Sequence, residues 1–365
     1  MKKTAAFLII AMVLFVSVFS AVNIFSAKEF LSGGAVFQNF ETALSQNIPF
    51  RNELSELMDR IRYFSGVRHF GDIYIGSGGS LLRDIENPTS RTFSSAKNYI
   101  LSFAEKYQTK PYFMLVPTSA VILQQEIENY ANENIYNQRS MIARMYAEFE
   151  GKVRTTDIYQ TLYDHRGEYI YYHTEDLPTS LGGYYIYGEL CSRLGLTQNT
   201  MDSFSAAYAA HGFYGSLATD FFKAYASPDF ITLYEYIGDS KKFVIERFNT
   251  NGTTQVSESV FIYNEKLFED KTDMIFGGLS AVMEVTSAES TGERNSILIF
   301  GDESAKSWLP FLISNYERVT FIDLNAANKE LLSGVNPAEY GQILFAYSTA
   351  TFSSGIDFEK LDFVG

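Results

Sequence analysis

The chain has a single cysteine, Cys191, and only four histidines among 365 residues. One cysteine forms no intrachain disulfide, and the Cys/His clusters that hold structural zinc are missing. Basic residues are also scarce, because 29 Lys and Arg stand against 43 Asp and Glu and give a net charge of −14. Proteins that bind nucleic acids or anionic lipids need clustered Lys and Arg. We therefore expect no cofactor, no metal and no nucleic-acid partner.

A long stretch without charged residues follows the first three residues. Lys2 and Lys3 are followed by residues 4–27 without a charged side chain. The apolar core at residues 5–22 has about the 20 residues that span a bilayer, and its best small-x-small cleavage site, at residues 18–20, is poor. Because positive flanks stay inside, the chain after residue 28 is expected outside the plasma membrane. We predict a single-pass signal anchor over 1–27; a cleaved signal peptide and secretion, or a buried core helix, are the alternatives.

What the chain does contain is apolar and aromatic: 46% hydrophobic residues, 31 Phe and 25 Tyr. This composition supplies a large core and argues against disorder. Residues 28–65 are predicted to form a linker around Ser32-Gly33-Gly34-Ala35 and an amphipathic helix, since Phe50, Leu54, Leu57, Met58 and Ile61 recur at helical spacing.

Beyond this helix, alternating strand and helix patterns predict an α/β domain over 66–202 and 294–365. A hairpin is expected around Ser77-Gly78-Gly79, and the second strand after these glycines argues against a phosphate-binding loop. Helices are expected at 94–107, 124–150 and 181–194, and strands at 112–116, 152–158, 296–300, 318–322 and 342–347. Such apolar runs suit a parallel sheet buried on both faces.

The segment 203–293 has shorter, alternating runs. Residues 243–248 and 259–263 are predicted to pair across an Asn251-Gly252 turn, so this segment is expected to be an antiparallel β-rich insertion. The predicted fold class is α/β: a flavodoxin-like parallel sheet flanked by helices, with this insertion. Ligands of such sheets bind beyond the carboxyl ends of the strands, here after 112–117, 168–173 and 296–300.

Three segments lie in or next to those loops: residues 116–119, 172–187 and 299–312. Together they resemble the DHHW family, SGNH-like proteins of Gram-positive bacteria related to the polysaccharide O-acetyltransferases of alginate export. Shorter echoes lie at Pro49-Phe50-Arg51, Tyr74-Ile75-Gly76, Phe213-Tyr214-Gly215 and Phe276-Gly277-Gly278. The order of the segments carries the resemblance, which implies an SGNH-like fold.

The resemblance also implies a Ser-His-Asp chemistry whose residues are replaced here. The family's Asp-His-His-Trp motif falls on residues 175–178, which puts Glu175 at the acid position and Leu177 at the base position. Its Lys-Asp-Ser segment falls on 301–303, so Glu303 takes the place of the nucleophile. Leucine accepts no proton, and losing the whole triad removes acyl transfer as a unit. The chain is therefore expected to be a pseudoenzyme.

Two rival interpretations stay open. Ser304 and His173 lie beside the replaced positions and could form a relocated nucleophile and base, which would make the chain an active O-acyl esterase or O-acetyltransferase. The structural alternative makes Ser304 a helix cap and His173 a strand residue. Separately, Glu175, Asp176, Asp302 and Glu303 could converge on Ca²⁺ or Mg²⁺, or simply complement helix dipoles.

Tyrosines cluster around the expected cleft. Tyr169, Tyr171, Tyr172, Tyr184, Tyr185 and Tyr187 could stack on sugars or pack in the core. The candidate ligand-binding residues are Glu175, Asp176, Asp302, Glu303, Ser304, Thr118 and Tyr184. We expect a non-catalytic, extracytoplasmic protein that binds cell-envelope polysaccharide or assists its modification, with the polysaccharide or a membrane acyltransferase as partner.

Overall fold

The computed structural model describes residues 51–128, 135–238, 243–287 and 295–365. The predicted anchor and linker lie outside these ranges. Within them, no helix combines the length and apolar character needed to cross a membrane. The chain divides into two units, Met1–Arg62 and Tyr63–Gly365. The predicted amphipathic helix is present as α3 (Arg51–Phe64).

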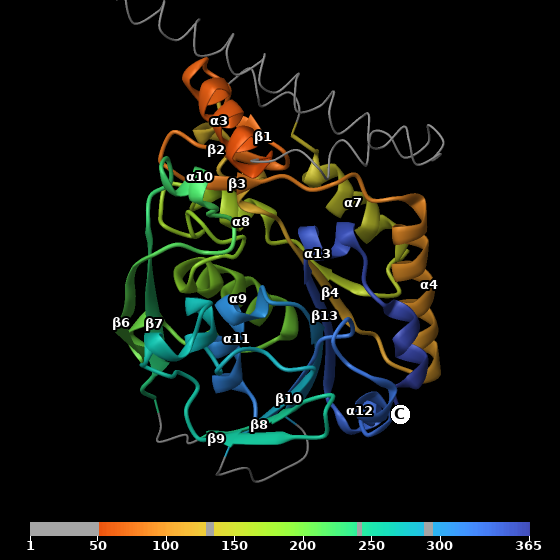
Figure 1. Ribbon diagram of the computed structural model, residues 1–365. Coiled ribbons are helices and arrows are strands. Elements are labelled where there is room, and N and C mark those ends of the chain that lie inside the picture. The colour runs from red at the N-terminus through yellow and green to blue at the C-terminus, as the bar shows by residue number, and fades with distance from the viewer. Residues whose placement is uncertain (1–50, 129–134, 239–242, 288–294) are drawn as a thin grey trace, which may run out of the picture. The chain divides into compact units, whose positions relative to one another are not determined.

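The larger unit is built on an eight-stranded sheet with the order β5-β4-β13-β11-β12-β10-β8-β9 (Figure 1). Five strands run parallel: β5 (Arg154–Thr156), β4 (Tyr112–Val116), β13 (Gln342–Ser348), β11 (Ser296–Gly301) and β12 (Arg318–Ile322). Three antiparallel strands extend the sheet beyond β12: β10 (Val282–Ser287), β8 (Phe243–Phe248) and β9 (Thr254–Ser257). The predicted fold class is confirmed.

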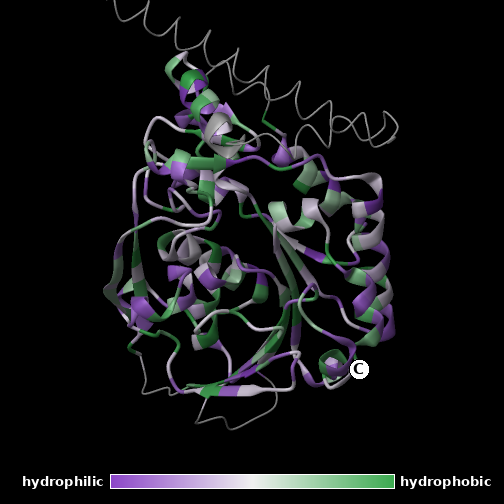
Figure 2. Cartoon of the chain, in the orientation of Figure 1, coloured by the Kyte–Doolittle hydropathy of each residue, from purple (hydrophilic) through white to green (hydrophobic). Residues whose placement is uncertain are grey.

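Helices cover both faces of this sheet, because successive strand residues point to opposite sides. In β4, Met114 and Val116 join one buried cluster while Phe113 and Leu115 join the other. The first face is covered by α5 (Ser119–Ile122), α8 (Tyr159–Asp164), α9 (Ser180–Leu194) and α11 (Ala305–Leu312). The second is covered by α4 (Ser90–Lys106), α7 (Gln138–Glu148), α12 (Lys329–Ser333) and the 3₁₀ helix Phe358–Phe363. Figure 2 shows the hydrophobic strands between these layers.

Two smaller sheets complete the fold. In the first, β1 (His69–Phe70), β2 (Ile73–Ile75) and β3 (Leu81–Arg83) are antiparallel. The hairpin predicted around Ser77-Gly78-Gly79 is thereby confirmed, and Gly79 has the positive φ of +82° that its turn requires. The second sheet pairs β6 (Phe204–Phe213) with β7 (Asp229–Tyr236). Short helices α10 (Asp220–Lys223) and α13 (Thr349–Ser354) follow β6 and β13.

Some sequence predictions of secondary structure are wrong. Residues 168–173 form no strand, and only Tyr171 makes an isolated bridge, to Pro178. The partner of β8 is β9, because the tight turn from Asn249 to Thr253 places Thr254 directly opposite Phe248. The predicted partner, residues 259–263, instead makes a single bridge between Phe261 and Ile275.

The helix predicted over 124–150 is also interrupted. A short 3₁₀ helix covers Gln124–Glu126, and α7 begins only at Gln138 because the Asn137 side chain caps it by accepting the Ser140 N–H at 2.9 Å. Part of the predicted helix, residues 129–134, lies outside the described residues.

Close helix packing depends on one glycine. A Cβ on Gly183 of α9 would lie 1.9 Å from the carbonyl oxygen of Ser307 in α11. Only glycine allows this approach. The contact places α11, and the acidic residues just before it, against α9.

Candidate functional site

Three central parallel strands end side by side, and a buried amide holds two of these ends together. The Gln138 side chain accepts the Thr118 N–H at 3.0 Å and donates to the Thr118 hydroxyl at 2.7 Å. It also accepts the Thr349 hydroxyl at 2.7 Å. Thr118 follows β4 and Thr349 follows β13, and all three side chains are buried. Thr118, a predicted ligand-binding residue, thus has its polar groups occupied within the protein.

Asp302 comes directly after β11 and fixes the neighbouring strand end. Its Oδ1 accepts the Ser304 N–H at 3.1 Å and the Ser304 hydroxyl at 2.6 Å. Its Oδ2 accepts the Ser348 N–H at 2.8 Å, at the end of β13. Asp302 is 7% exposed and Ser304 only 1%. The carboxylate therefore acts as a brace between β11 and β13.

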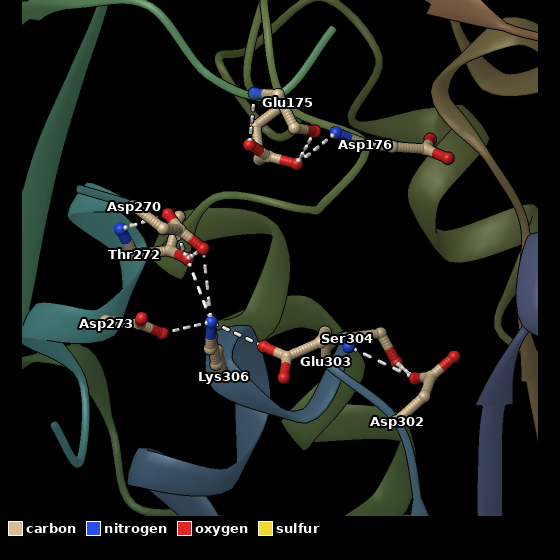
Figure 3. Close-up of polar contacts among 10 residues, drawn as sticks. Glu175, Asp176, Asp270, Thr272, Asp273, Asp302, Glu303, Ser304 and Lys306 are labelled. Carbon is tan, nitrogen blue, oxygen red and sulfur yellow. Dashed lines mark hydrogen bonds and ion pairs between the residues drawn. The ribbon is translucent and has the colours of Figure 1, made fainter. Parts of the chain in front are cut away.

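Glu303, which the sequence resemblance places at the nucleophile position, is paired with a buried lysine (Figure 3). The Lys306 ammonium also contacts Asp273 Oδ1 at 2.5 Å, the Thr272 hydroxyl at 3.1 Å and Asp270 Oδ2 at 3.4 Å. Burial by itself would lower the pKa of Lys306, but the surrounding carboxylates outweigh burial and raise it. Glu303 thus takes part in a structural ion cluster that joins α11 to the 3₁₀ helix Lys271–Met274.

Glu175, which the sequence resemblance places at the acid position, is also held within the protein. Its carboxylate accepts the N–H and the hydroxyl of Ser216, each at 2.7 Å, and the Asp176 N–H at 3.2 Å. A Cβ on Gly215 would lie 2.6 Å from Glu175 Oε2, so this glycine lets the two segments meet. The Phe213-Tyr214-Gly215 segment, noticed in the sequence, therefore positions Glu175.

Asp176 points away from Glu175 (Figure 3) and lacks a good partner. Arg83 Nη1 is 3.9 Å from Asp176 Oδ2, and within the described ranges Oδ1 is buried without a hydrogen bond. Burial raises the pKa of Asp176 to about 7; Arg83 opposes the rise, whereas Glu175 and Asp302 add to it. The ionised form of Asp176 is therefore disfavoured by its surroundings.

The two acidic loops do not touch one another. In the described part of the chain, no hydrogen bond or ion pair joins Glu175 or Asp176 to Asp302, Glu303 or Ser304. Burial is the main cause of the raised pKa of Asp176, and the charge of Asp302 adds a smaller contribution. Leu177, which the sequence resemblance places at the base position, is buried in the core and is 9% exposed.

The proposed pair of Ser304 and His173 is not formed. The ring of His173 lies against Tyr169, with centroids 4.9 Å apart, and its Nδ1 is 3.7 Å from Asp229. The Ser304 hydroxyl is donated to Asp302 and is covered. Ser304 stands at the N-cap of α11, but its side chain makes no capping bond, so the capping prediction is wrong in detail.

The four predicted carboxylates do not gather around a cation position. Among the residues that the structure describes, no group of three or more acidic, histidine or cysteine side chains has metal-site geometry. Where three carboxylates do approach one another, at Asp270, Asp273 and Glu303, the Lys306 ammonium stands between them. Of the four predicted carboxylates, only Glu303 belongs to this cluster, and its cation is the Lys306 side chain.

The predicted tyrosine cluster separates into two groups. Tyr171, Tyr172 and Tyr187 are core residues with at most 3% exposure. Tyr169, Tyr184 and Tyr185 are partly buried. Tyr184, a predicted ligand-binding residue, donates to the Asn199 carbonyl at 3.3 Å, away from the acidic loops.

With this geometry in place, the comparisons with known proteins are decisive on one point. The family described as DHHW protein matches residues 85–322. The chain belongs to the DHHW family. A solved DHHW family protein from Eubacterium siraeum has 19% identity and a TM-score of 0.63, covering 80% of this chain and 98% of its own. No curated protein matches.

A second solved structure has the same fold at lower identity. Bacillus cereus PatB1, solved with a sulfonyl adduct, has 11% identity and a TM-score of 0.64, covering 81% of this chain and all of its own. At these identities the likeness concerns the fold.

Sequence reasoning missed several residues that organise the site. Gln138 links strand ends, Lys306 neutralises the acidic cluster, and Asp229 anchors the backbone before Glu175. Lys306 could have been found from the sequence, because it follows Glu303 by three residues and residues at this spacing lie on one face of a helix, where they can form an ion pair. Gln138 and Asp229 lie far from their partners in the chain and have no local signature.

Proposed function

We propose that this chain is a non-catalytic DHHW protein that binds cell-envelope polysaccharide or assists its modification. Its relation to polysaccharide O-acetyltransferases, inferred from the sequence resemblance, supports the polysaccharide. A membrane acyltransferase is the second proposed partner. We further propose that residues 5–22 anchor the chain in the plasma membrane and leave the folded domain outside.

One observation carries the proposal: every family triad position is committed to the structure of the protein. Glu303 is paired with Lys306, Glu175 binds Ser216, and Leu177 lies in the core. Acyl transfer needs an accessible nucleophile with a base within hydrogen-bond reach. The nearby hydroxyl of Ser304 is buried and donates a hydrogen bond to Asp302. An active esterase thus has no supporting observation.

The test uses the full chain, extracted from membranes in detergent, with p-nitrophenyl acetate and an aryl sulfonyl fluoride. We expect hydrolysis at the rate of buffer and no mass gain from the sulfonyl reagent. The variants are Ser304→Ala and, as a matched control, Ser353→Ala, whose hydroxyl lies on the surface. Turnover or labelling that Ser304→Ala abolishes and Ser353→Ala preserves would contradict the proposal. Recovery of the protein in the soluble fraction would contradict the anchor.

A further inference from the structure

A second region of the molecule, away from the ion cluster of Lys306, contains a hollow. A hollow of about 210 Å³ lies between the β6–β7 sheet and the segment around the start of α9. We call it the aromatic groove; it is lined by Tyr169, Thr179, Ser180, Leu181, Ala206, Tyr208, Phe230, Thr232 and Tyr234. None of these side chains is charged.

The alternation of β7 builds one wall of the aromatic groove. Ile231 and Leu233 are fully buried in the core, so Phe230, Thr232 and Tyr234 face the other way. Tyr208 of β6 is paired with Thr232 and stands beside this row. The hairpin thus presents aromatic rings and hydroxyls on its groove face.

The rings form a continuous apolar surface. Phe230 stacks on Tyr169 with centroids 4.5 Å apart and an interplanar angle of 24°. The Tyr208 ring lies 6.2 Å from Phe230 and is 71% exposed. Exposed aromatic rings of this kind are typical of binding surfaces, because a large apolar area remains in contact with water.

The groove also offers unused hydroxyls. Throughout the described residues, those of Tyr208, Thr232 and Tyr234 have no hydrogen-bond partner, whereas the Tyr169 hydroxyl donates to Asp229 at 2.5 Å. Tyr208 and Tyr234 both line the groove, and burial, followed by the nearby Tyr208, raises the pKa of Tyr234. Ligand sites combine apolar walls with a few polar groups that fix orientation.

These features together select one chemical class of ligand. Sugar rings have apolar C–H faces that pack on aromatic rings and hydroxyls that exchange hydrogen bonds at the rim. Anionic polymers need Lys or Arg, and the groove has neither in a chain of net charge −14. We propose that the aromatic groove binds a neutral saccharide chain. This inference rests on the proposed polysaccharide function and names the ligand class and its place.

The groove is also connected to the family site. Asp229 Oδ1 accepts the Tyr169 hydroxyl and, at 2.6 Å, the His173 N–H, while Oδ2 accepts the Thr174 N–H at 2.8 Å. The same buried carboxylate therefore fixes a wall of the groove and the backbone that leads into Glu175. A saccharide in the groove would lie beside the segment that carries the family motif.

The experiment is isothermal titration of the full chain in a detergent without a sugar headgroup. The probes are an N-acetylglucosamine hexamer, a glucose hexamer and, as anionic comparison, a guluronate hexamer. We expect a neutral hexamer to bind and Tyr208→Ala to weaken it about five- to tenfold, since an aromatic contact is worth about 1 kcal/mol. Tyr163→Ala, with a tyrosine 37% exposed on α8, is the control and should bind normally.

A second variant, Thr232→Arg, fills the groove and should abolish binding while circular dichroism remains native. If a neutral saccharide binds and neither Tyr208→Ala nor Thr232→Arg changes its affinity, the groove is not the binding site. The proposed function would not be contradicted by that result. Binding of the guluronate hexamer alone would overturn the neutral ligand. No binding of any hexamer to a folded protein would overturn both the groove and the polysaccharide function, and the esterase assay tests the non-catalytic part separately.

Discussion

The acidic site and the aromatic groove treat their polar groups in opposite ways. At the acidic site nearly every carboxylate has an internal donor, and Lys306 is surrounded by three of them. In the groove, the Tyr208 ring is exposed, and the hydroxyls of Tyr208, Thr232 and Tyr234 have no hydrogen-bond partner within the described residues. Polar groups that are satisfied internally stabilise a fold, whereas unsatisfied groups at a surface are available to ligands. The position inherited by resemblance and the position suited to binding are therefore different.

The largest expected effect comes from removing the internal cation. Lys306→Met leaves Asp270, Asp273 and Glu303 without their shared partner, and we expect a loss of about 3 kcal/mol in the free energy of unfolding, measured by urea denaturation. Because the three carboxylates are partly exposed, water offsets part of the loss. Glu303→Gln, which removes one partner, should cost less than about 1 kcal/mol.

Saccharide titration of folded Lys306→Met tests whether the acidic site and the aromatic groove have separate roles. If the variant keeps its stability but loses saccharide binding, the cluster is a ligand site and the distinction between the two regions fails.

A smaller effect is expected at the residue that the two regions share. Asp229→Asn places an amide where a carboxylate accepts several donors, so we expect a loss of about 2 kcal/mol in stability and weaker saccharide binding. Thermal unfolding and the titration measure the two effects on one protein preparation. Asp220→Asn, with a side chain 91% exposed, is the matched control. Unchanged binding in Asp229→Asn would show that the groove is independent of the family segment.

The smallest expected effect depends on pH. The folded-state pKa of Asp176 is raised from 3.8 to about 7, so the folded state binds this proton more tightly than the unfolded chain. Stability therefore falls as pH rises from about 4 to 7. At pH 8 the free energy of unfolding of Asp176→Asn should exceed that of the parent by about 1 kcal/mol, and near pH 4 the two should be equal. The whole pKa shift sets an upper limit of about 4 kcal/mol on this difference.

Urea denaturation at both pH values measures this difference, with Asp220→Asn again as control. A destabilised Asp176→Asn at pH 8 would mean that the ionised carboxylate has a favourable partner, and the acidic site would then resemble a working cleft.

The sequence predicted the central sheet well because its strands are long apolar runs. The runs at 112–116, 296–300 and 318–322 bury both faces, and each became a parallel strand. The strand expected at 168–173 did not form, because its aromatic residues pack in the core and its backbone bonds to Asp229 rather than to a strand. The neighbour that decides such a segment lies far away in the sequence.

Candidate site residues were harder to predict for a related reason. Asp302 and Glu303 are adjacent in sequence but serve different partners, one bracing β13 and the other pairing with Lys306. Charge patterns show where acidic residues lie and not which donors meet them. Of the tyrosines singled out in the sequence, Tyr169 lines the groove. The other aromatic residues of the groove, Tyr208, Phe230 and Tyr234, are brought together by the pairing of β6 with β7.

The place of β13 also governs how the molecule can fold. This strand comes near the end of the chain yet lies between β4 and β11, with Leu344 opposite Tyr112. The parallel sheet therefore stays divided, with two unpaired edges, until almost the whole chain is available. Such non-local pairing is slow to form and exposes strand edges in the meantime. A chain that ends before Gln342 would lack the centre of its own sheet, and its incomplete form would be prone to aggregate.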